Sequence, residues 1–150
     1  MQSPTIPFRL SPARLEEQLA QFNVRSEVKW FGFKGAYRDP GFAVITFSNL
    51  EAGHQGGAGT AAINGGVIAA GFDAAFVLAG LGHYESQVVV TLELSVKFLS
   101  VARVSESLAF EARVVRSAKN FAFAEGFLSQ GGAAERPHLA IATAMVAPTR

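Results

Sequence analysis

The sequence predicts an α+β fold in which one buried helix is wrapped by an antiparallel β-sheet. The first observation is the segment 64–81, NGGVIAAGFDAAFVLAGL, which is apolar on every side of a helix. Such a helix either spans a membrane or lies inside a soluble core. The segment lacks the roughly 18 uninterrupted apolar residues that a span needs, because Asp73 lies in its middle. The second observation is a series of strand-like segments, joined by turn signals, that follows this helix.

Composition limits the classes of function. The 150 residues predict one domain, and 49% hydrophobic residues with thirteen Phe are ample for a core. A net charge of +1 argues against nucleic-acid binding as the main role. The absence of Cys excludes thiolate catalysis and zinc–thiolate sites, and the three His residues lack metal-ligand spacing. No signal-peptide pattern opens the chain, so we expect a cytoplasmic protein with neither a metal nor a membrane partner.

The first half of the chain alternates helix and strand signals. Ser11-Pro12 is a typical helix start, and Leu15, Leu19 and Phe22 follow at helical spacing. Residues 24–33 have a mixed pattern that favours a strand or a loop over the core. A turn is predicted at 38–41, and the β-branched and aromatic run 42–47 is typical of a strand.

The second half reads as a meander of strands. Segment 88–99 alternates, with Leu92, Leu94, Val96 and Phe98 on one face and Thr91, Glu93, Ser95 and Lys97 on the other. Further strands are predicted at 108–116, 121–128 and 139–146. Their connections are a turn at 104–106, a hairpin at 117–120 and a longer link at 130–137. Successive hairpins would place these strands side by side in one sheet, with the apolar helix packed against it.

Asp73 is the main candidate for a functional residue. Carboxylates are rarely buried without a partner, and no Lys, Arg or His lies one helical turn away. Its partner must therefore come from elsewhere, or its pKa must be raised. The alternative is a structural carboxylate that bonds a loop backbone or faces a solvent channel. At the start of the helix, Asn64 can cap the N-terminus, and Gly65 and Gly66 offer amide donors to an anion or a developing oxyanion. The simpler interpretation there is a plain cap.

Several motifs carry a resemblance to a known family. In order they are a Gly-rich loop at 51–60 containing His54, Asn64-Gly65-Gly66, an acid nine residues after the Asn, Lys97-Phe98-Leu99, and Ala140 to Ala144 in the last strand. Over residues 42–147 the chain resembles the hotdog-fold acyl-CoA thioesterases of the PaaI-like, phenylacetate-pathway branch. The resemblance implies a single hotdog domain over 1–150, with a lead-in and short helix at 1–23 and a core at 42–147.

The resemblance also implies roles for site residues. Asp73 corresponds to the family's general base or nucleophile, and the two routes stay open. The amide of Gly65 corresponds to the group that polarises the thioester carbonyl, and Thr91 to a residue that places the water. The family motif usually begins with His where this chain has Asn64, which can donate a hydrogen bond but cannot shuttle a proton. For Thr91 the alternative is an exposed strand residue, because the alternation groups it with Glu93 and Lys97.

The resemblance also implies where the substrate binds, and helix geometry and the resemblance both imply an oligomer. Arg116 and Lys119 correspond to residues that often hold CoA phosphates, although exposed basic residues are usually plain surface. CoA would enter only as part of an acyl-CoA substrate, and no other cofactor is expected. Eight helical residues separate Gly65 from Asp73 by about 12 Å. One carbonyl cannot reach both groups in one chain, so we expect a homodimer, or a tetramer of dimers, with shared sites.

The sequence therefore predicts an acyl-CoA thioesterase, and two alternatives remain open. One is a non-catalytic acyl-CoA or acyl-chain binding protein of the same fold, which the Asn64 departure favours. The other is a hotdog hydratase, for which His54 would be the candidate base. No Ser-His-Asp order or nucleophile elbow is present, which argues against an α/β-hydrolase.

Overall fold

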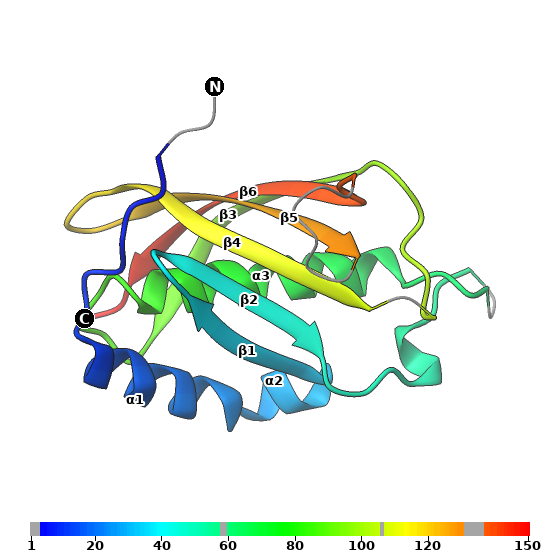
Figure 1. Cartoon of the computed structure of the whole chain (residues 1–150), viewed down its shortest axis with the longest axis horizontal. Helices are drawn as coiled ribbons and strands as arrows, with labels where there is room; N and C mark the ends of the chain where they lie inside the picture. The colour runs from blue at the N-terminus through cyan, green and yellow to red at the C-terminus, as the bar shows by residue number, and fades with distance from the viewer. Residues whose placement is uncertain (1–3, 58–59, 106, 131–136) are drawn as a thin grey trace.

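The computed structural model describes residues 4–57, 60–105, 107–130 and 137–150 (Figure 1). Its elements are α1 (Pro12–Asn23), α2 (Ser26–Trp30), β1 (Phe33–Arg38), β2 (Phe42–Phe47), the 3-10 helix η1 (Ala52–His54), α3 (Gly65–Leu81), β3 (Val89–Phe98), β4 (Leu108–Ser117), β5 (Ala122–Gln130) and β6 (Ala140–Pro148). The predicted central helix and the strand 42–47 are confirmed. The predicted link at 130–137 and the end of the turn at 104–106 lie largely outside the described residues.

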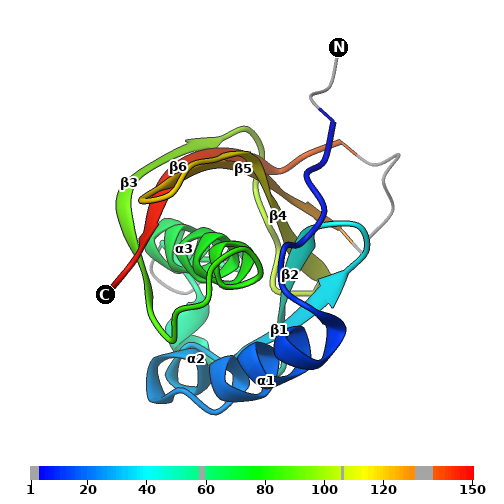
Figure 2. The same ribbon diagram turned by 90° about the vertical axis from the view of Figure 1, so that its left-hand side faces the viewer.

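The six strands form one antiparallel sheet in the order β1-β2-β4-β5-β6-β3. The sheet curves around α3, and α1 and α2 close the side that the strands leave open (Figure 2). The predicted α+β architecture, a central helix wrapped by an antiparallel sheet, is therefore confirmed. Among the helices in the described ranges, none is both long and apolar enough to cross a membrane.

Two expectations, one about the order of the strands and one about residues 24–33, are wrong, and one strand was not predicted. The strands β4, β5 and β6 are neighbours as predicted, but β3 pairs with β6 instead of β4 and forms an edge of the sheet. The chain between β3 and β4 therefore crosses the sheet, and β4 pairs with β2. Residues 24–33 contain the short helix α2, and β1 was not anticipated because Gly35 and Lys34 dilute its strand pattern. Tertiary packing overrides weak local propensity in such short segments.

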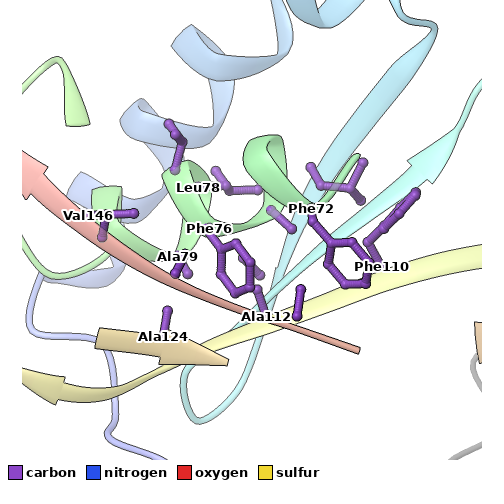
Figure 3. Packing of buried hydrophobic residues seen from close by; sticks show 14 of the residues in the cluster. Phe72, Phe76, Leu78, Ala79, Phe110, Ala112, Ala124 and Val146 are labelled. Carbon is purple, nitrogen blue, oxygen red and sulfur yellow. The ribbon is translucent and has the colours of Figure 1, made fainter. Parts of the chain in front are cut away.

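The core lies between α3 and the inner face of the sheet. Phe72, Phe76 and Leu78 from α3 are fully buried, and Figure 3 shows Phe72 beside Phe110 of β4. The rings of Phe72 and Phe110 meet edge to face, with 5.2 Å between their centroids. Gly71 permits this contact, because a Cβ at that position would lie 2.3 Å from the Phe110 ring. Burial of each of these large side chains stabilises the fold by about 2–3 kcal/mol.

The helix α3 is not enclosed on all sides, which corrects the expectation of a fully buried helix. Its C-terminal half, from Ala75 to Leu81, is buried throughout. Towards the N-terminus, Gly65 and Gly66 are exposed, and Ala70, Asp73 and Ala74 are half-buried. These half-buried residues recur at helical spacing and so form one stripe. An apolar sequence thus leaves an open stripe on α3, and Asp73 lies within it.

Candidate active site

Asp73 and Thr91 form a hydrogen-bonded pair between the central helix and an edge strand. The hydroxyl of Thr91 donates to Oδ1 of Asp73 across 2.5 Å, and both residues are half-buried. The partner that the helix could not supply therefore comes from β3, eighteen residues further along the chain. A carboxylate that accepts such a bond keeps its second oxygen available for a water molecule or a substrate.

An irregularity in β3 turns Thr91 towards the helix. Thr91 pairs with Val146 and Glu93 pairs with Met145, so Leu92 is an extra residue in the strand. A β-bulge of this kind shifts the alternation of side chains by one residue. The predicted grouping of Thr91 with Glu93 and Lys97 is therefore wrong. Thr91 shares the inner face with Val89, which is buried.

The start of α3 offers free donors. The side chain of Asn64 caps the helix, because its Oδ1 accepts from the N–H of Gly66 across 2.7 Å. Neither the backbone N–H of Gly65 nor the side-chain NH2 group of Asn64 has an acceptor among the described residues, whereas the backbone N–H of Asn64 donates to the carbonyl of His54. All three residues are exposed, and a Cβ at Gly65 would lie 3.5 Å from the ring of Phe98. This end carries partial positive charge from the helix dipole, so it favours an oxygen that gains negative charge.

Gly65 and Asp73 do not meet within one chain. Both belong to the same uninterrupted helix, with Gly65 at its first position. Eight residues at 1.5 Å per residue separate them by about 12 Å. An oxyanion donor must lie about 3 Å from the reacting oxygen, and the base must reach the same reaction centre. A single chain therefore presents the two groups separately.

A groove of about 460 Å³ opens beside the Asp73–Thr91 pair, between α2, α3 and β3. The lining is mostly apolar, and includes Val28, Phe31, Phe33, Ala70, Ala74 and Val77. Arg25 and Glu27 are the other charged residues that line it. Sequence reasoning missed the contribution of residues 24–33 because they were interpreted as a strand or loop over the core. Such a groove accommodates an apolar group next to a carboxylate.

Arg116 and Lys119 lie in a different place. Both are exposed at the hairpin between β4 and β5, and neither lines the groove that contains Asp73. The hydroxyl of Tyr84, just beyond α3, donates to the carbonyl of Ala118 across 2.7 Å and holds this hairpin. No ion pair of Arg116 or Lys119 is found within the described ranges. Their charges are thus open to a ligand at the molecular surface.

His54 is engaged in holding the loop. Its Nδ1 accepts from the N–H of Glu51 across 2.9 Å, and its Nε2 lies 2.6 Å from the carbonyl of Phe31. Because Nδ1 accepts, Nε2 carries the proton and donates to that carbonyl. The ring is also buried, with 8% of its surface exposed. Neither nitrogen is available for proton transfer to a substrate, which argues against the hydratase alternative.

A second hollow lies on the outer face of the sheet and holds none of the predicted catalytic residues. It measures about 490 Å³, and its lining includes the ion-paired side chains of Arg38 with Glu111 and Arg113 with Glu125. Arg38 and Arg113 are paired with neighbouring acids, whereas Lys97, which also lines the hollow, has no ion pair among the described residues. Within the described residues, no group of three or more His, Asp or Glu side chains could hold a metal ion.

Comparison with known proteins identifies the fold. Residues 61–134 match the family model of the thioesterase superfamily. Similar solved structures include the E. coli PaaI protein from the phenylacetic acid degradation operon, with TM-score 0.77 and 18% identity over 92% of this chain and 95% of that one. A thioesterase family protein from Silicibacter pomeroyi has TM-score 0.71 and 20% identity over 89% and 94% of the chains. Thioesterase superfamily member 2 of Mus musculus has TM-score 0.71 and 15% identity over 91% and 97%.

No curated protein sequence matches this chain. The six-stranded antiparallel sheet around α3 is the hotdog fold that the resemblance implied, so this prediction is confirmed.

Proposed function

Because this hotdog-fold chain matches the thioesterase superfamily over residues 61–134, we propose that it hydrolyses an acyl-CoA thioester to a free acid and CoA. The observation that carries the proposal is the Thr91–Asp73 hydrogen bond at the edge of an apolar groove. A carboxylate beside an apolar pocket, with one oxygen oriented and the other free, is suited to attack on an acyl group.

The chemistry assigns one role to each group. Asp73 removes a proton from water while the water oxygen attacks the thioester carbonyl carbon. The carbonyl oxygen then becomes an oxyanion, which the N–H of Gly65 stabilises with the amide of Asn64 as a second donor. Collapse of this intermediate breaks the carbon–sulfur bond, and the departing thiolate takes the proton from Asp73. In the alternative route the carboxylate attacks the carbonyl carbon, and the carbon–sulfur bond breaks to release the thiolate and leave a mixed anhydride. Water then hydrolyses the anhydride, which frees the acid and restores the Asp73 carboxylate.

The active form is a homo-oligomer, a dimer or a tetramer of dimers. The separation of Gly65 and Asp73 along α3 requires that one subunit supplies the donor and another the carboxylate. The edge strand β3 supports an interface, because Val90, Leu92 and Phe98 expose 39%, 56% and 55% of their surface. Exposed apolar residues gathered on an unpaired edge are typical of a protein–protein contact.

A CoA moiety brings phosphate groups, and the exposed Arg116 and Lys119 are proposed to bind them. CoA thus enters as part of the substrate. The other candidate function is a non-catalytic acyl-CoA binding protein, which Asn64 favours because an amide cannot transfer a proton. That protein would keep the groove and the basic hairpin and lack turnover.

Release of free thiol from a panel of acyl-CoAs tests the proposal. We expect saturable release with the wild-type protein and a loss of at least about 100-fold in Asp73→Asn, which keeps the shape of the side chain. Binding of acyl-CoA by calorimetry without release in either protein would establish the binding-protein alternative. Equal release by the two proteins would remove Asp73 from the mechanism.

A further inference from the structure

We propose that the groove beside Asp73 ends in a stop formed by Phe22 and Arg25, which restricts the substrate to short, uncharged acyl groups. The inference rests on the proposed thioesterase function and adds a substrate class to it. It depends on the direction of the groove, on the contacts that close one end, and on the charges along its walls.

The groove runs along α3, with β3 antiparallel to the helix. Thr91 contacts Asp73, and Val89 lies beside Gly80, since a Cβ built on Gly80 would be 2.9 Å from Val89. Lower residue numbers in β3 thus correspond to the C-terminal half of α3. In the other direction the helix leads to the exposed residues Gly65 and Gly66. The groove is therefore enclosed towards the C-terminus of α3. It is open towards the N-terminus of α3, where the CoA part of the substrate would lie.

Phe22 and Arg25 close the enclosed end. A Cβ at Gly35 would lie 2.7 Å from Leu78 and 2.9 Å from Phe22, which places the buried Phe22 ring beside the helical turn that contains Val77 and Leu78. Nη2 of Arg25 donates to the carbonyl of Gln87 across 2.8 Å. The Arg25 guanidinium also lies 5.7 Å from the centroid of the Phe22 ring. Arg25 thus links the segment between α1 and α2 to the residues that precede β3.

The length of the enclosed part follows from helix geometry. Asp73 and Val77 both line the groove, and four residues of helix separate them by about 6 Å. A thioester carbonyl held at Asp73 has about that distance for its acyl tail before the stop. This suits an acyl group no longer than a short chain or a single ring. Ala74 lies between the two positions, and its small side chain keeps this space open.

The charges that line the groove favour an uncharged tail. Among the described residues that line the groove, Arg25 is the one basic side chain, and Asp73 and Glu27 are the two acidic ones. Arg25 already donates to the Gln87 carbonyl, and the remaining wall around Ala74 and Val77 is apolar. A carboxylate at the far end of an acyl chain would lose water without full compensation.

Two variants test the stop in opposite directions, with kcat/KM measured across straight-chain acyl-CoAs from acetyl to dodecanoyl and for one ω-carboxyacyl-CoA. In the wild type we expect a maximum at hexanoyl or shorter and little activity on the ω-carboxyacyl substrate. Arg25→Ala opens the end and should raise the decanoyl-to-butanoyl ratio about tenfold or more. Ala74→Leu fills the groove and should lower the hexanoyl-to-acetyl ratio by a similar factor. Lys29→Ala removes an exposed cation from α2 outside the groove and should leave the profile unchanged.

A binding measurement separates this inference from the proposed function. Trp30 is the only tryptophan, and its ring meets Phe31 of the groove edge to face at 4.8 Å between centroids. Its fluorescence can follow the binding of free carboxylic acids from butanoate to decanoate. If the protein hydrolyses no thioester, but binds free acids up to a chain length that both variants shift, then the thioesterase function is refuted. The stop formed by Phe22 and Arg25 is supported in that case. Hydrolysis with one chain-length profile for wild type, Arg25→Ala and Ala74→Leu overturns the stop and leaves the function intact. A preference for the ω-carboxyacyl substrate overturns the uncharged class.

Discussion

The hydroxyl of Thr91 donates a hydrogen bond of 2.5 Å to the carboxylate of Asp73, which joins the edge strand to the middle of the central helix. This bond fixes the orientation of the carboxylate without neutralising it. We predict that Thr91→Val, which removes the donor at nearly constant shape, lowers kcat about tenfold, since one such bond is worth about 1–1.5 kcal/mol. Thr91→Ser keeps the hydroxyl and should keep most of the activity. If steady-state kinetics show equal kcat for Val and Ser, then the bond has no part in catalysis.

The contact between Gly71 and Phe110 makes a prediction about stability. A Cβ at Gly71 would lie 2.3 Å from the Phe110 ring, which is fully buried and cannot move aside. Gly71→Ala should therefore destabilise the fold by about 1–3 kcal/mol, although alanine favours helix formation. Gly53→Ala is the control, because a Cβ there meets nothing within 4 Å. Urea unfolding compares the two, and equal midpoints would show that the helix and sheet do not pack this closely.

His83 predicts a pH dependence of stability. Burial, and secondarily the charge of Arg9, lower the pKa of His83 to about 4 from the usual 6.5, and both ring nitrogens lack a partner among the described residues. Between these pKa values the unfolded chain binds a proton that the folded chain does not. The free energy of unfolding should therefore fall by roughly 2 kcal/mol between about pH 7 and about pH 5.

The variant His83→Phe separates this contribution from that of the carboxylates. It keeps a ring beside Phe8, which lies 5.5 Å from His83 between centroids, and it removes the titrating group. In His83→Phe, the free energy of unfolding should fall on acidification by roughly 2 kcal/mol less than it does in the wild type. His138→Phe serves as control, since His138 is exposed. An identical pH dependence for wild type and His83→Phe would show that His83 titrates normally.

The proposed CoA contact makes a prediction about salt. Lys119→Ala should raise KM for acyl-CoA several-fold and leave kcat almost unchanged, with the effect diminishing at high ionic strength. The control is Lys34→Ala, which removes an exposed lysine from β1. If KM in low-salt buffer is the same for wild type and Lys119→Ala, then Lys119 is an ordinary surface residue.

The sequence predicted those parts of the fold that strong periodicity determines. The apolar run 65–81 could only be an internal helix, and the predicted strand 42–47 has the observed bounds. The position of β3 beside β6 was not predictable, because hairpin rules favour consecutive neighbours and β3 is joined by a crossover. The short helix α2 was also missed, since five residues carry little periodic signal.

The type of a residue predicted which residues belong to the candidate site better than sequence patterns predicted where their side chains lie. An acid within an apolar helix was recognisable, and its lack of a local partner indicated one from elsewhere in the chain. The face of Thr91 was wrongly predicted because the bulge at Leu92 leaves no mark in the alternation of side chains. The groove walls from Phe22, Arg25 and Val28 depend on the packing of α1 and α2 against β1, which no local pattern encodes.

We propose that each site combines Gly65 of one subunit with Asp73 of another. Gly65→Pro deletes the proposed oxyanion N–H, and proline is tolerated at the first position of a helix. Losing one oxyanion donor should cost about 100-fold or more in kcat. Asp73→Asn should be inactive as well, so each variant alone is expected to fail.

Differently tagged copies of the two variants, co-expressed and purified through both tags, give the decisive measurement. A mixed dimer contains one site with both lesions and one site with an intact Gly65 and an intact Asp73. We predict that thioester hydrolysis by the purified mixed dimer returns to about half of the wild-type rate per dimer. A mixed dimer as inactive as both parents would contradict the shared site.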